Sequence, residues 1–292
     1  MPIALLIGGI ILLLVAAFAV IKGRRQHHKR ALIEDTETTD VRNIKDEGLV
    51  ELKGTVRADD PVDSPIKGEK STLSAWEIEE WDERGDFGMW QTRAAGVYAA
   101  PFELDDGTGR IRVDVSDHVN DTSTGTGIDD IQLGAIDVDR LLSNGISIDN
   151  IYASIDGFSV ETSVPPDTDP PERIREFVQG ETAIGTQTDS ITNLLDVGTQ
   201  HGERRYYEGT LGPNDDVYVL REARATEDAT HPLKPEDIVI SSVDDGQFII
   251  SNKFEAELTE SFGQYKYAYA GAIVATVAGI VAIVIGAGIV SL

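Results

Sequence analysis

The stretch "FELDDGTGRIRVDV", from Phe102 to Val115, predicts a β-hairpin and with it a mainly β fold. Apolar and polar residues alternate on both sides of a central turn, which is the pattern of strands with one buried face. The turn at 105–109 contains two aspartates and two glycines. Asp side chains cap tight turns, and glycine adopts positive φ angles at little cost, so we expect these residues to form the turn.

The same alternation recurs before and after this hairpin, in segments bounded by Gly, Pro, Asp and Asn. Further strands are predicted at 49–56, 71–81, 89–104, 204–223 and 237–253. We interpret residues 204–223 as a hairpin around a turn at 212–215. We interpret residues 237–253 as a strand pair around a turn at 244–246. A short helix is expected at 170–181, where prolines precede an amphipathic pattern and Gly180 ends it, and a loop at 116–135.

The fold class that these elements predict is mainly β (α+β), with one or two short helices. The stretches "LKGTVRADDPV" (52–62) and "YEGTLGPNDDVYV" (207–219) share the order strand, Gly-Thr, turn with two aspartates, apolar residue. This echo indicates two β-rich lobes, at 48–160 and 172–258, each interpreted as a small OB-like barrel. Two matches do not establish a duplication, so a single domain stays the alternative.

Two apolar segments enclose the β-rich part. Residues 3–21 are 19 positions without a charge, and as a helix they would span a hydrocarbon core of roughly 30 Å. Residues 268–292 are similarly apolar. Because a helix satisfies its backbone hydrogen bonds within one segment, we expect transmembrane helices at 1–22 and 266–292. A cleaved signal peptide is the alternative for the first segment, but no basic residue precedes its apolar run.

The charges are sharply segregated along the chain. All 51 acidic residues lie between residues 31 and 265, where only 19 basic residues accompany them and leave a net charge of −32. Salt screens the self-repulsion of such a charge, so the composition indicates an acidic surface adapted to molar salt, as in halophilic archaea. An acidic protein with basic partners is the alternative. Nucleic-acid binding is not expected, because it needs a basic face.

The remaining basic residues flank the two apolar segments. "KGRRQHHKR" (22–30) follows the first directly, and Lys266 precedes the second. The positive-inside rule therefore predicts a two-pass protein of the cell membrane with its soluble part in the cytoplasm. Residues 23–47 are interpreted as basic flank and linker, and 48–265 as the β-rich domain. Gly271, Ala275 and Gly279 are spaced by four, which permits close packing on the first helix or on a second copy of the chain.

No catalytic, cofactor-binding or metal-binding motif stands out. There is no cysteine, which excludes disulfides, thiolate catalysis and cysteine-based zinc sites within these residues. The Asp-rich turns at 105–109 and 214–216 lack the spacing of an EF-hand. Trp76, Trp81 and Trp90 are expected to pack on a sheet rather than to line a groove. We predict no catalytic residue, no cofactor and no metal, since none of the histidines has a partner at ligand spacing: His27, His28, His118, His201 and His231.

Four stretches together resemble the GIDE family, also called the BAM (beside a membrane) domain family. They are "KGTV" with "SPIKGE" (53–69), "PFELDDGTGRIRVD" (101–114), "ERIREFVQG" (172–180) and "RRYYEGTLGPNDDVYVLREA" (204–223). The layout of helix, soluble domain and helix is also similar. One departure follows "SPIKGE", where "KSTL" (70–73) and then Trp76 stand in place of a Pro-Cys-Val-Tyr run.

The resemblance implies a membrane-anchored, non-catalytic interaction or scaffold module with an unknown protein partner, linked to a ubiquitin-like protein-modification pathway or to membrane organisation. The eukaryotic mitochondrial ubiquitin ligase of this family carries a RING, whose two zinc ions need cysteine and histidine ligands. Without cysteine, these 292 residues cannot contain a RING, so we expect no ligase activity of that kind from them. An enzyme with an uncharted site, or an accessory subunit of a membrane enzyme, is the alternative.

Overall fold

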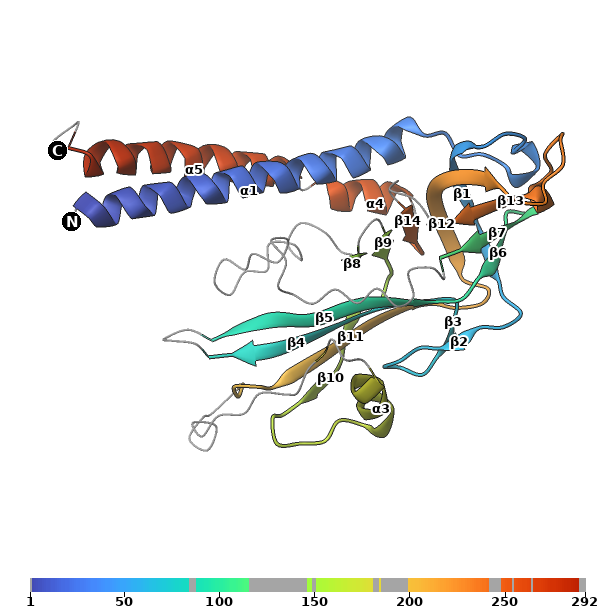
Figure 1. Ribbon diagram of the computed structural model, residues 1–292, viewed down its shortest axis with the longest axis horizontal. Helices are drawn as coiled ribbons and strands as arrows, with labels where there is room; N and C mark the ends of the chain where they lie inside the picture. The colour runs from blue at the N-terminus through green and yellow to red at the C-terminus, as the bar shows by residue number, and fades with distance from the viewer. Residues whose placement is uncertain are drawn as a thin grey trace. The chain divides into compact units, whose positions relative to one another are not determined.

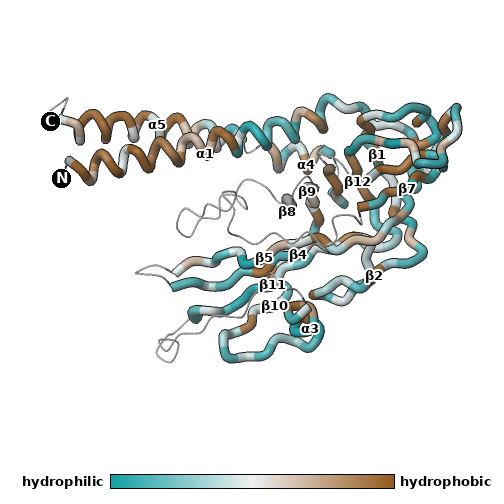
Figure 2. Tube along the Cα trace, in the orientation of Figure 1, coloured by the Kyte–Doolittle hydropathy of each residue, from teal (hydrophilic) through white to brown (hydrophobic). Residues whose placement is uncertain are grey.

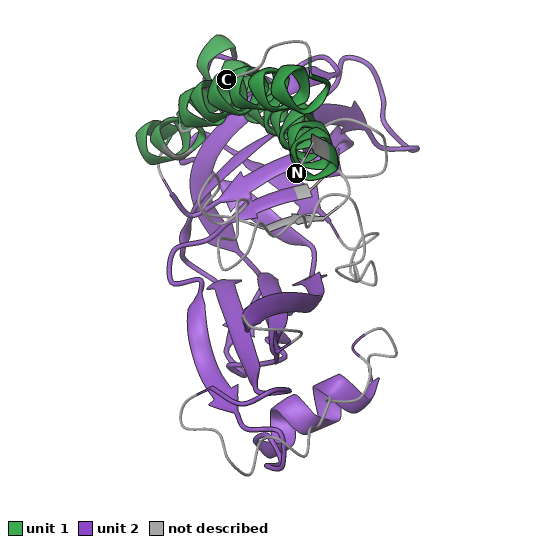
Figure 3. Ribbon diagram, turned by 90° about the vertical axis from the view of Figure 1, so that its left-hand side faces the viewer, with its two compact units in different colours: residues 1–35, 255–292 green, residues 36–254 purple. Residues whose placement is uncertain are grey.

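The computed structural model describes residues 2–83, 88–115, 146–148, 151–180, 184, 199–241, 248–253, 255–263 and 265–288. Two compact units are distinguished by their internal contacts (Figure 3). The helical unit consists of Met1–Asp35 and Glu255–Leu292, and the β unit consists of Thr36–Phe254. The predicted loop at 116–135 and the predicted turn at 244–246 lie outside the described residues.

Three helices form the helical unit: α1 (Pro2–Asp35), α4 (Glu255–Phe262) and α5 (Tyr265–Gly286). α1 and α5 run side by side (Figure 1), and α4 also packs on α1. α1 continues through the basic flank, so the first part of the predicted linker at 23–47 is helical. Residues 24–35 are rich in Arg, Lys, Gln, Ala and Leu, which favour helices, and contain no proline.

Small residues let α1 and α5 approach each other closely. A Cβ atom added at Gly9 would lie 2.7 Å from the carbonyl oxygen of Gly279 and 2.6 Å from a side-chain carbon of Ile283. Further along, the rings of His27 and Tyr265 meet edge to face at 4.9 Å between centroids. Gly9 and His27 are separated by as many residues as Ile283 and Tyr265, so the two helices are antiparallel in a constant register.

The small residues of α5 that pack against α1 differ in part from those that the sequence pattern indicated. Gly279 is buried, as the prediction that it packs requires, but Gly271 is exposed and an added Cβ would meet nothing within 4 Å. Gly271 therefore does not pack on α1, and packing of this residue on a second copy of the chain stays a prediction. The buried small residues recur instead at intervals of four and seven, which keeps one face of α5 against its antiparallel neighbour: Ala268, Ala272, Gly279 and Gly286.

Apolar side chains cover the outside of this helix pair. Ile3 on α1 and Val274 on α5 are 71% and 68% exposed, and both helices are hydrophobic along most of the stretch they share (Figure 2). Both are long and apolar enough to cross a membrane, and only 11% and 17% of their most apolar windows are buried. A core helix of a soluble protein would bury most of this surface.

Five strands of the β unit close into a barrel: β1 (Gly48–Arg57), β6 (Phe102–Asp105), β7 (Arg110–Asp114), β13 (Ile238–Ser241) and β12 (Asp216–Ala225). Each pairs with the next, and β12 pairs back with β1. Within this ring, β7 and β13 are parallel and the other pairs antiparallel. A closed five-stranded ring in this order matches an OB-like barrel. The predicted class, a β-rich α+β fold, is confirmed.

The barrel core consists of the inward-facing residues of all five strands, among them Leu52, Leu104, Val113, Val219 and Ile240. Gly54 lies where β1 passes from β12 to β6. A Cβ atom added there would lie 2.6 Å from Leu104 Cδ2 and 2.7 Å from the carbonyl oxygen of Asp105. Glycine therefore permits the close approach of backbones that closes the ring.

Three further strands extend this sheet from β12, in the order β14 (Phe248–Ser251), β9 (Ile151–Ser154) and β8 (Ile146–Ile148). The described residues of the β unit also include two single turns of 3-10 helix, η1 (Val41–Asn43) and η4 (Pro235–Asp237). The predicted hairpin at 102–115 is confirmed, because β6 and β7 pair antiparallel across the turn that contains Gly107, whose φ is 79°.

A second sheet of the β unit has the antiparallel order β10 (Ser159–Val164), β11 (Arg204–Leu211), β4 (Leu73–Asp82) and β5 (Met89–Ala99). The short strands β2 (Val62–Asp63) and β3 (Lys70–Ser71) form a separate ladder. The predicted helix is confirmed as α3 (Glu172–Gly180), whose Ile174 joins Trp76 in a second core. Trp76 also meets Phe177 edge to face, so its predicted packing role is confirmed.

The strands do not separate into the predicted lobes at 48–160 and 172–258. β1 pairs with β12, and β4 pairs with β11, so each sheet combines strands from both segments. The predicted hairpin at 204–223 is wrong, because β11 and β12 belong to different sheets and their connection carries the chain between them. β13 and β14 likewise pair with β12 and not with each other. Alternation predicts strands, whereas distant segments decide which strands pair.

Candidate functional site

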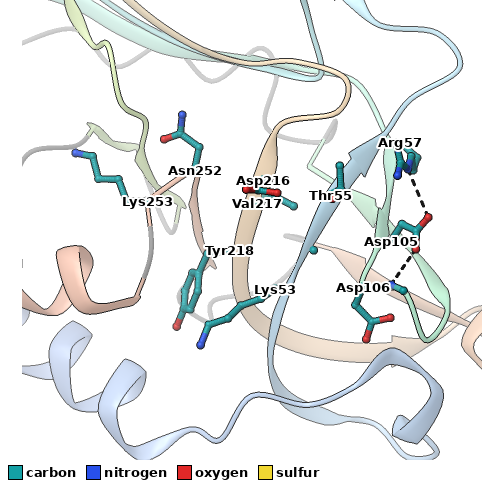
Figure 4. A pocket seen from close by; sticks show the side chains of 12 residues that line it. Lys53, Thr55, Arg57, Asp105, Asp106, Asp216, Val217, Tyr218, Asn252 and Lys253 are labelled. Carbon is teal, nitrogen blue, oxygen red and sulfur yellow. Dashed lines mark hydrogen bonds and ion pairs between the residues drawn. The ribbon is translucent and has the colours of Figure 1, made fainter.

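A pocket of about 570 Å³ lies on the outside of the barrel, at β1, β12 and the β6–β7 turn (Figure 4). The core residues of β1 point into the barrel, so the alternate residues Lys53, Thr55 and Arg57 face outward. The other residues that line the pocket are Gly54, Asp105, Asp106, Gly107, Asp216, Val217, Tyr218, Asn252 and Lys253.

A buried carboxylate positions the side chains at one end of this pocket. Glu51 of β1 is only 1% exposed. It accepts hydrogen bonds from the hydroxyls of Thr38 at 2.6 Å and Tyr218 at 2.8 Å, and pairs with the Lys53 ammonium at 2.9 Å. The same ammonium lies 5.8 Å from the centroid of the Tyr218 ring. Three donors on one buried carboxylate fix Lys53 and Tyr218 relative to the barrel.

The β6–β7 turn forms the opposite rim. Asp105 accepts a hydrogen bond from Gly107 N–H at 3.0 Å and pairs with Arg57 at 3.4 Å. The Gly107 hydrogen bond, helped by Arg57 and the neighbouring Arg110, lowers the pKa of Asp105. Asp105 therefore stabilises the turn through Gly107 and holds Arg57 at the rim of the pocket.

Asp106 connects the turn to the segment before β1. It accepts hydrogen bonds from Val41 N–H at 2.7 Å, Thr108 N–H at 2.8 Å and Gly109 N–H at 2.9 Å. Partial burial opposes the charged form, yet these hydrogen bonds prevail and lower the pKa of Asp106. The turn-forming role that the sequence predicted is confirmed for this side chain.

The positive groups of the pocket are each matched by a carboxylate. Lys53 pairs with Glu51, Arg57 pairs with Asp105, and the Lys253 ammonium lies 3.6 Å from Asp156. These three positive charges are therefore balanced by carboxylates of the same domain. They do not resemble a nucleophile held beside a base, which covalent catalysis needs.

A second buried carboxylate, Glu208 of β11, holds the loop between β2 and β3. It accepts hydrogen bonds from the hydroxyls of Ser64 at 3.0 Å and Ser74 at 2.6 Å, and from the N–H groups of Ile66 and Lys67. Glu208 is fully buried. The "SPIKGE" and "YYEGT" segments, far apart in the sequence, therefore form one structural feature.

Several acidic residues that the composition placed at the surface are buried in β4: Glu77, Glu79, Glu80 and Asp82. Glu79 accepts a hydrogen bond from the Tyr207 hydroxyl at 2.6 Å. Glu80 binds Arg204 at 2.8 Å and Arg93 at 2.9 Å. A sequence signal existed, because the strand "EIEE" faces "RRYY" on β11, but the pairing of these strands was needed to interpret it.

None of the described histidines lines the pocket, and only His201 lies close to one of the buried carboxylates, with its Nδ1 3.8 Å from Asp82 Oδ1. His27 and His28 belong to α1, and His231 is exposed. His201 precedes β11, where its Nδ1 accepts a hydrogen bond from Glu83 N–H at 3.1 Å. His118 lies outside the described residues, which contain no group of three or more His, Cys, Asp or Glu side chains placed to hold a metal ion.

The two remaining tryptophans pair across β4 and β5. The rings of Trp81 and Trp90 are 5.4 Å apart, and the guanidinium of Arg205 stacks 3.8 Å from the Trp90 ring centroid. Both rings are half-buried on the sheet. They form a cross-strand pair, as expected for aromatic residues that stabilise a sheet.

Comparisons with protein-family models, with curated proteins and with solved structures found no match to this chain. The resemblance to the GIDE family therefore stays an expectation, drawn from the four sequence stretches and the layout of helix, soluble domain and helix. Three of these stretches supply residues with defined structural roles: Gly54 at the closure of the barrel, Asp106 in the β6–β7 turn and Glu208 under the "SPIKGE" loop.

Proposed function

We propose that this chain is a two-pass membrane protein that holds an OB-like barrel domain at the cytoplasmic face of the cell membrane. The domain acts there as a GIDE-like, non-catalytic interaction module that binds a protein partner. The α1–α5 pair anchors it, and the balanced polar pocket of the barrel contacts the partner.

The observation that carries this proposal is the exposed apolar surface of α1 and α5. Side chains such as Ile7, Leu14 and Val277 are more than half exposed although both helices pack against each other. A contiguous apolar surface of this kind is costly in water and marks contact with lipid or another apolar surface. The length of both helices suits a bilayer core of roughly 30 Å.

The orientation is supported by the register of the two helices. Because α1 and α5 are antiparallel, Asp35 and Tyr265 lie towards the same end of the pair, and the β unit is connected to that end. The basic residues at 22–30 and Lys266 also lie there. The positive-inside rule places such an end in the cytoplasm.

The interaction role is supported by the arrangement of charges in the pocket. Lys53, Arg57 and Lys253 are held by carboxylates of the same domain, so they offer fixed donors beside acidic acceptors. A partner segment that carries both charges would find complementary groups on this surface.

Site-specific photo-crosslinking in native membranes tests the interaction role. A photoreactive residue placed at Thr55 in the pocket is expected to give one reproducible adduct, and the same residue at the exposed Glu227 is expected to give none. Mass spectrometry then identifies the attached protein. Absence of a reproducible adduct at Thr55, or the same adducts at both positions, would contradict the proposed role of the pocket.

A further inference from the structure

A hollow of about 640 Å³ lies on the helical unit, close to the connection to the β unit. It is lined by Arg24, Arg25, His27, His28 and Ala31 of α1 and by Tyr269 of α5. Both arginines and both histidines are exposed. Among the described residues, no acidic side chain lines the hollow, although acidic residues outnumber basic ones two to one in the whole chain.

The hollow lies at the level where the apolar surface ends. The uncharged run of α1 stops at Ile21, and Arg24 and His28 follow within two turns of the helix. Gly23 of α1 faces the ring of Tyr269, so α5 contributes a tyrosine at the same level. Tyrosine and basic side chains at the end of an apolar span occupy the headgroup region of a bilayer.

Arg24 differs from most arginines of this protein in its surroundings. Arg57, Arg93 and Arg204 bind carboxylates in the β unit, and Arg30 binds Glu34 at 2.7 Å one turn beyond the hollow. Within the described part of the chain, Arg24 makes no hydrogen bond or ion pair, and the same holds for His28. Their donors are available to a group from outside the protein.

We propose that this hollow binds the phosphate headgroup of an anionic lipid. The inference rests on the proposed membrane anchoring. Arg24 offers a planar fork of N–H donors that matches phosphate oxygens, Arg25 adds positive charge, and His28 and the Tyr269 hydroxyl offer further hydrogen bonds. The described lining of the hollow contains no carboxylate, so an anionic headgroup would supply a negative charge next to Arg24 and His28. Free phosphate shares this chemistry, and only a lipid would also contact the apolar surface beside the hollow.

Native mass spectrometry of the full chain in a neutral detergent tests the site. Phosphatidylglycerol and phosphatidylcholine are offered at equal concentration, and the retained lipid is counted. We expect retention of phosphatidylglycerol over phosphatidylcholine, and a loss of about five-fold or more in Arg24→Gln, as for removal of one cation from an anionic membrane surface. Lys266→Gln is the matched control, because it removes one positive charge at the same level outside the hollow.

Three results would overturn the site. The first is equal retention of both lipids, and the second is an equal loss in both variants, which would indicate unspecific attraction. The third is displacement of phosphatidylglycerol by millimolar inorganic phosphate, which would identify free phosphate as the ligand. Extraction of membranes with alkaline carbonate tests the membrane anchoring of the chain separately from lipid binding in the hollow. Arg24→Gln should stay in the membrane fraction like the unchanged protein, whereas release of the unchanged protein would contradict the proposed function itself.

Discussion

Gly54 is the residue on which closure of the barrel depends most directly. β1 pairs with β12 as far as Thr55 and with β6 from Thr55 onward, and the backbone of β6 fills the space beside Gly54. We expect Gly54→Ala to lower the free energy of unfolding by about 1–3 kcal/mol, the usual cost of overpacking a core. Chemical denaturation of the full chain in detergent, followed by tryptophan fluorescence, measures the change.

Gly180→Ala provides the matched control for this substitution. Gly180 ends α3, and an added Cβ would meet nothing within 4 Å. Its replacement should leave stability unchanged or raise it slightly, because alanine loses less backbone entropy than glycine. Equal destabilisation by the two substitutions would contradict the role assigned to Gly54.

Glu208 is expected to be the most sensitive carboxylate of the β unit. Glu208→Ala removes the acceptor of four hydrogen bonds and leaves buried donors unsatisfied, so we expect a loss of about 3 kcal/mol. Limited proteolysis should then cleave within the loop at 64–69. Glu222→Ala, which removes an exposed carboxylate paired with Arg224, should change stability by less than about 0.5 kcal/mol. Similar effects of both would show that Glu208 does not hold the loop.

The two aspartates of the β6–β7 turn should make the stability of the β unit depend on pH. The folded state lowers the pKa of Asp105 and Asp106 below the ordinary value of 3.8 and so favours their ionised forms. Their contribution is therefore present above pH 4 or so and is lost as the pH falls through the lowered pKa values. In Asp106→Asn, stability at neutral pH should be lower and should fall less between pH 5 and pH 2. A variant with the same pH dependence as the unchanged protein would contradict this account.

Among the elements, the α1–α5 pair depends on small residues at defined positions. In Gly279→Ile the new side chain would collide with the backbone of Gly9, whereas in Gly271→Ile it would project into open space. Since the chain contains no cysteine, thiol crosslinking can report the packing directly. A short bifunctional maleimide should join His27→Cys to Tyr265→Cys in the unchanged background and with Gly271→Ile, and much less with Gly279→Ile. Equal crosslinking in all three would contradict the requirement for a small residue at position 279, and no crosslinking in the unchanged background would contradict the register.

The elements also show where reasoning from the sequence succeeds and where it stops. The hairpin of β6 and β7 was predictable, because alternation and turn residues lie within one short stretch. The strands β11 and β12 were predictable singly, but their assignment to different sheets depends on β4 and β1, more than 100 residues away in the chain. Gly271 and Gly279 show the same limit, because spacing identifies a small-residue face and only the neighbouring helix selects the residues that pack.

The pocket on the barrel was not predictable for a related reason. Lys53 and Arg57 are ordinary charged residues of a strand, and nothing near them in the sequence indicates that Glu51 is buried behind Lys53 or that Asp105 faces Arg57. The burial of Glu80 was missed likewise, because an acidic composition suggested surface charge. Adaptation to molar salt stays a prediction. Some of the acidic residues on which it was based are buried and bind donors inside the β unit.

At the scale of the whole molecule, two units with different surfaces belong to one chain. The helical unit presents apolar side chains outward, and the β unit carries most of the acidic residues. A membrane accommodates the first surface and water the second. The central claim is therefore that both helices cross the membrane and leave the β unit on one side and the ends of the chain on the other.

Labelling of single cysteines with a membrane-impermeant maleimide tests this claim most directly, because the chain has no cysteine of its own. In closed right-side-out vesicles, Ala287→Cys beyond the end of α5 should react at once, and Glu227→Cys in the β unit only after the vesicles are opened. Leu14→Cys, in the middle of the apolar run, should react only after detergent is added. Reaction of Ala287→Cys and Glu227→Cys from the same side, or of Leu14→Cys in intact vesicles, would contradict the account.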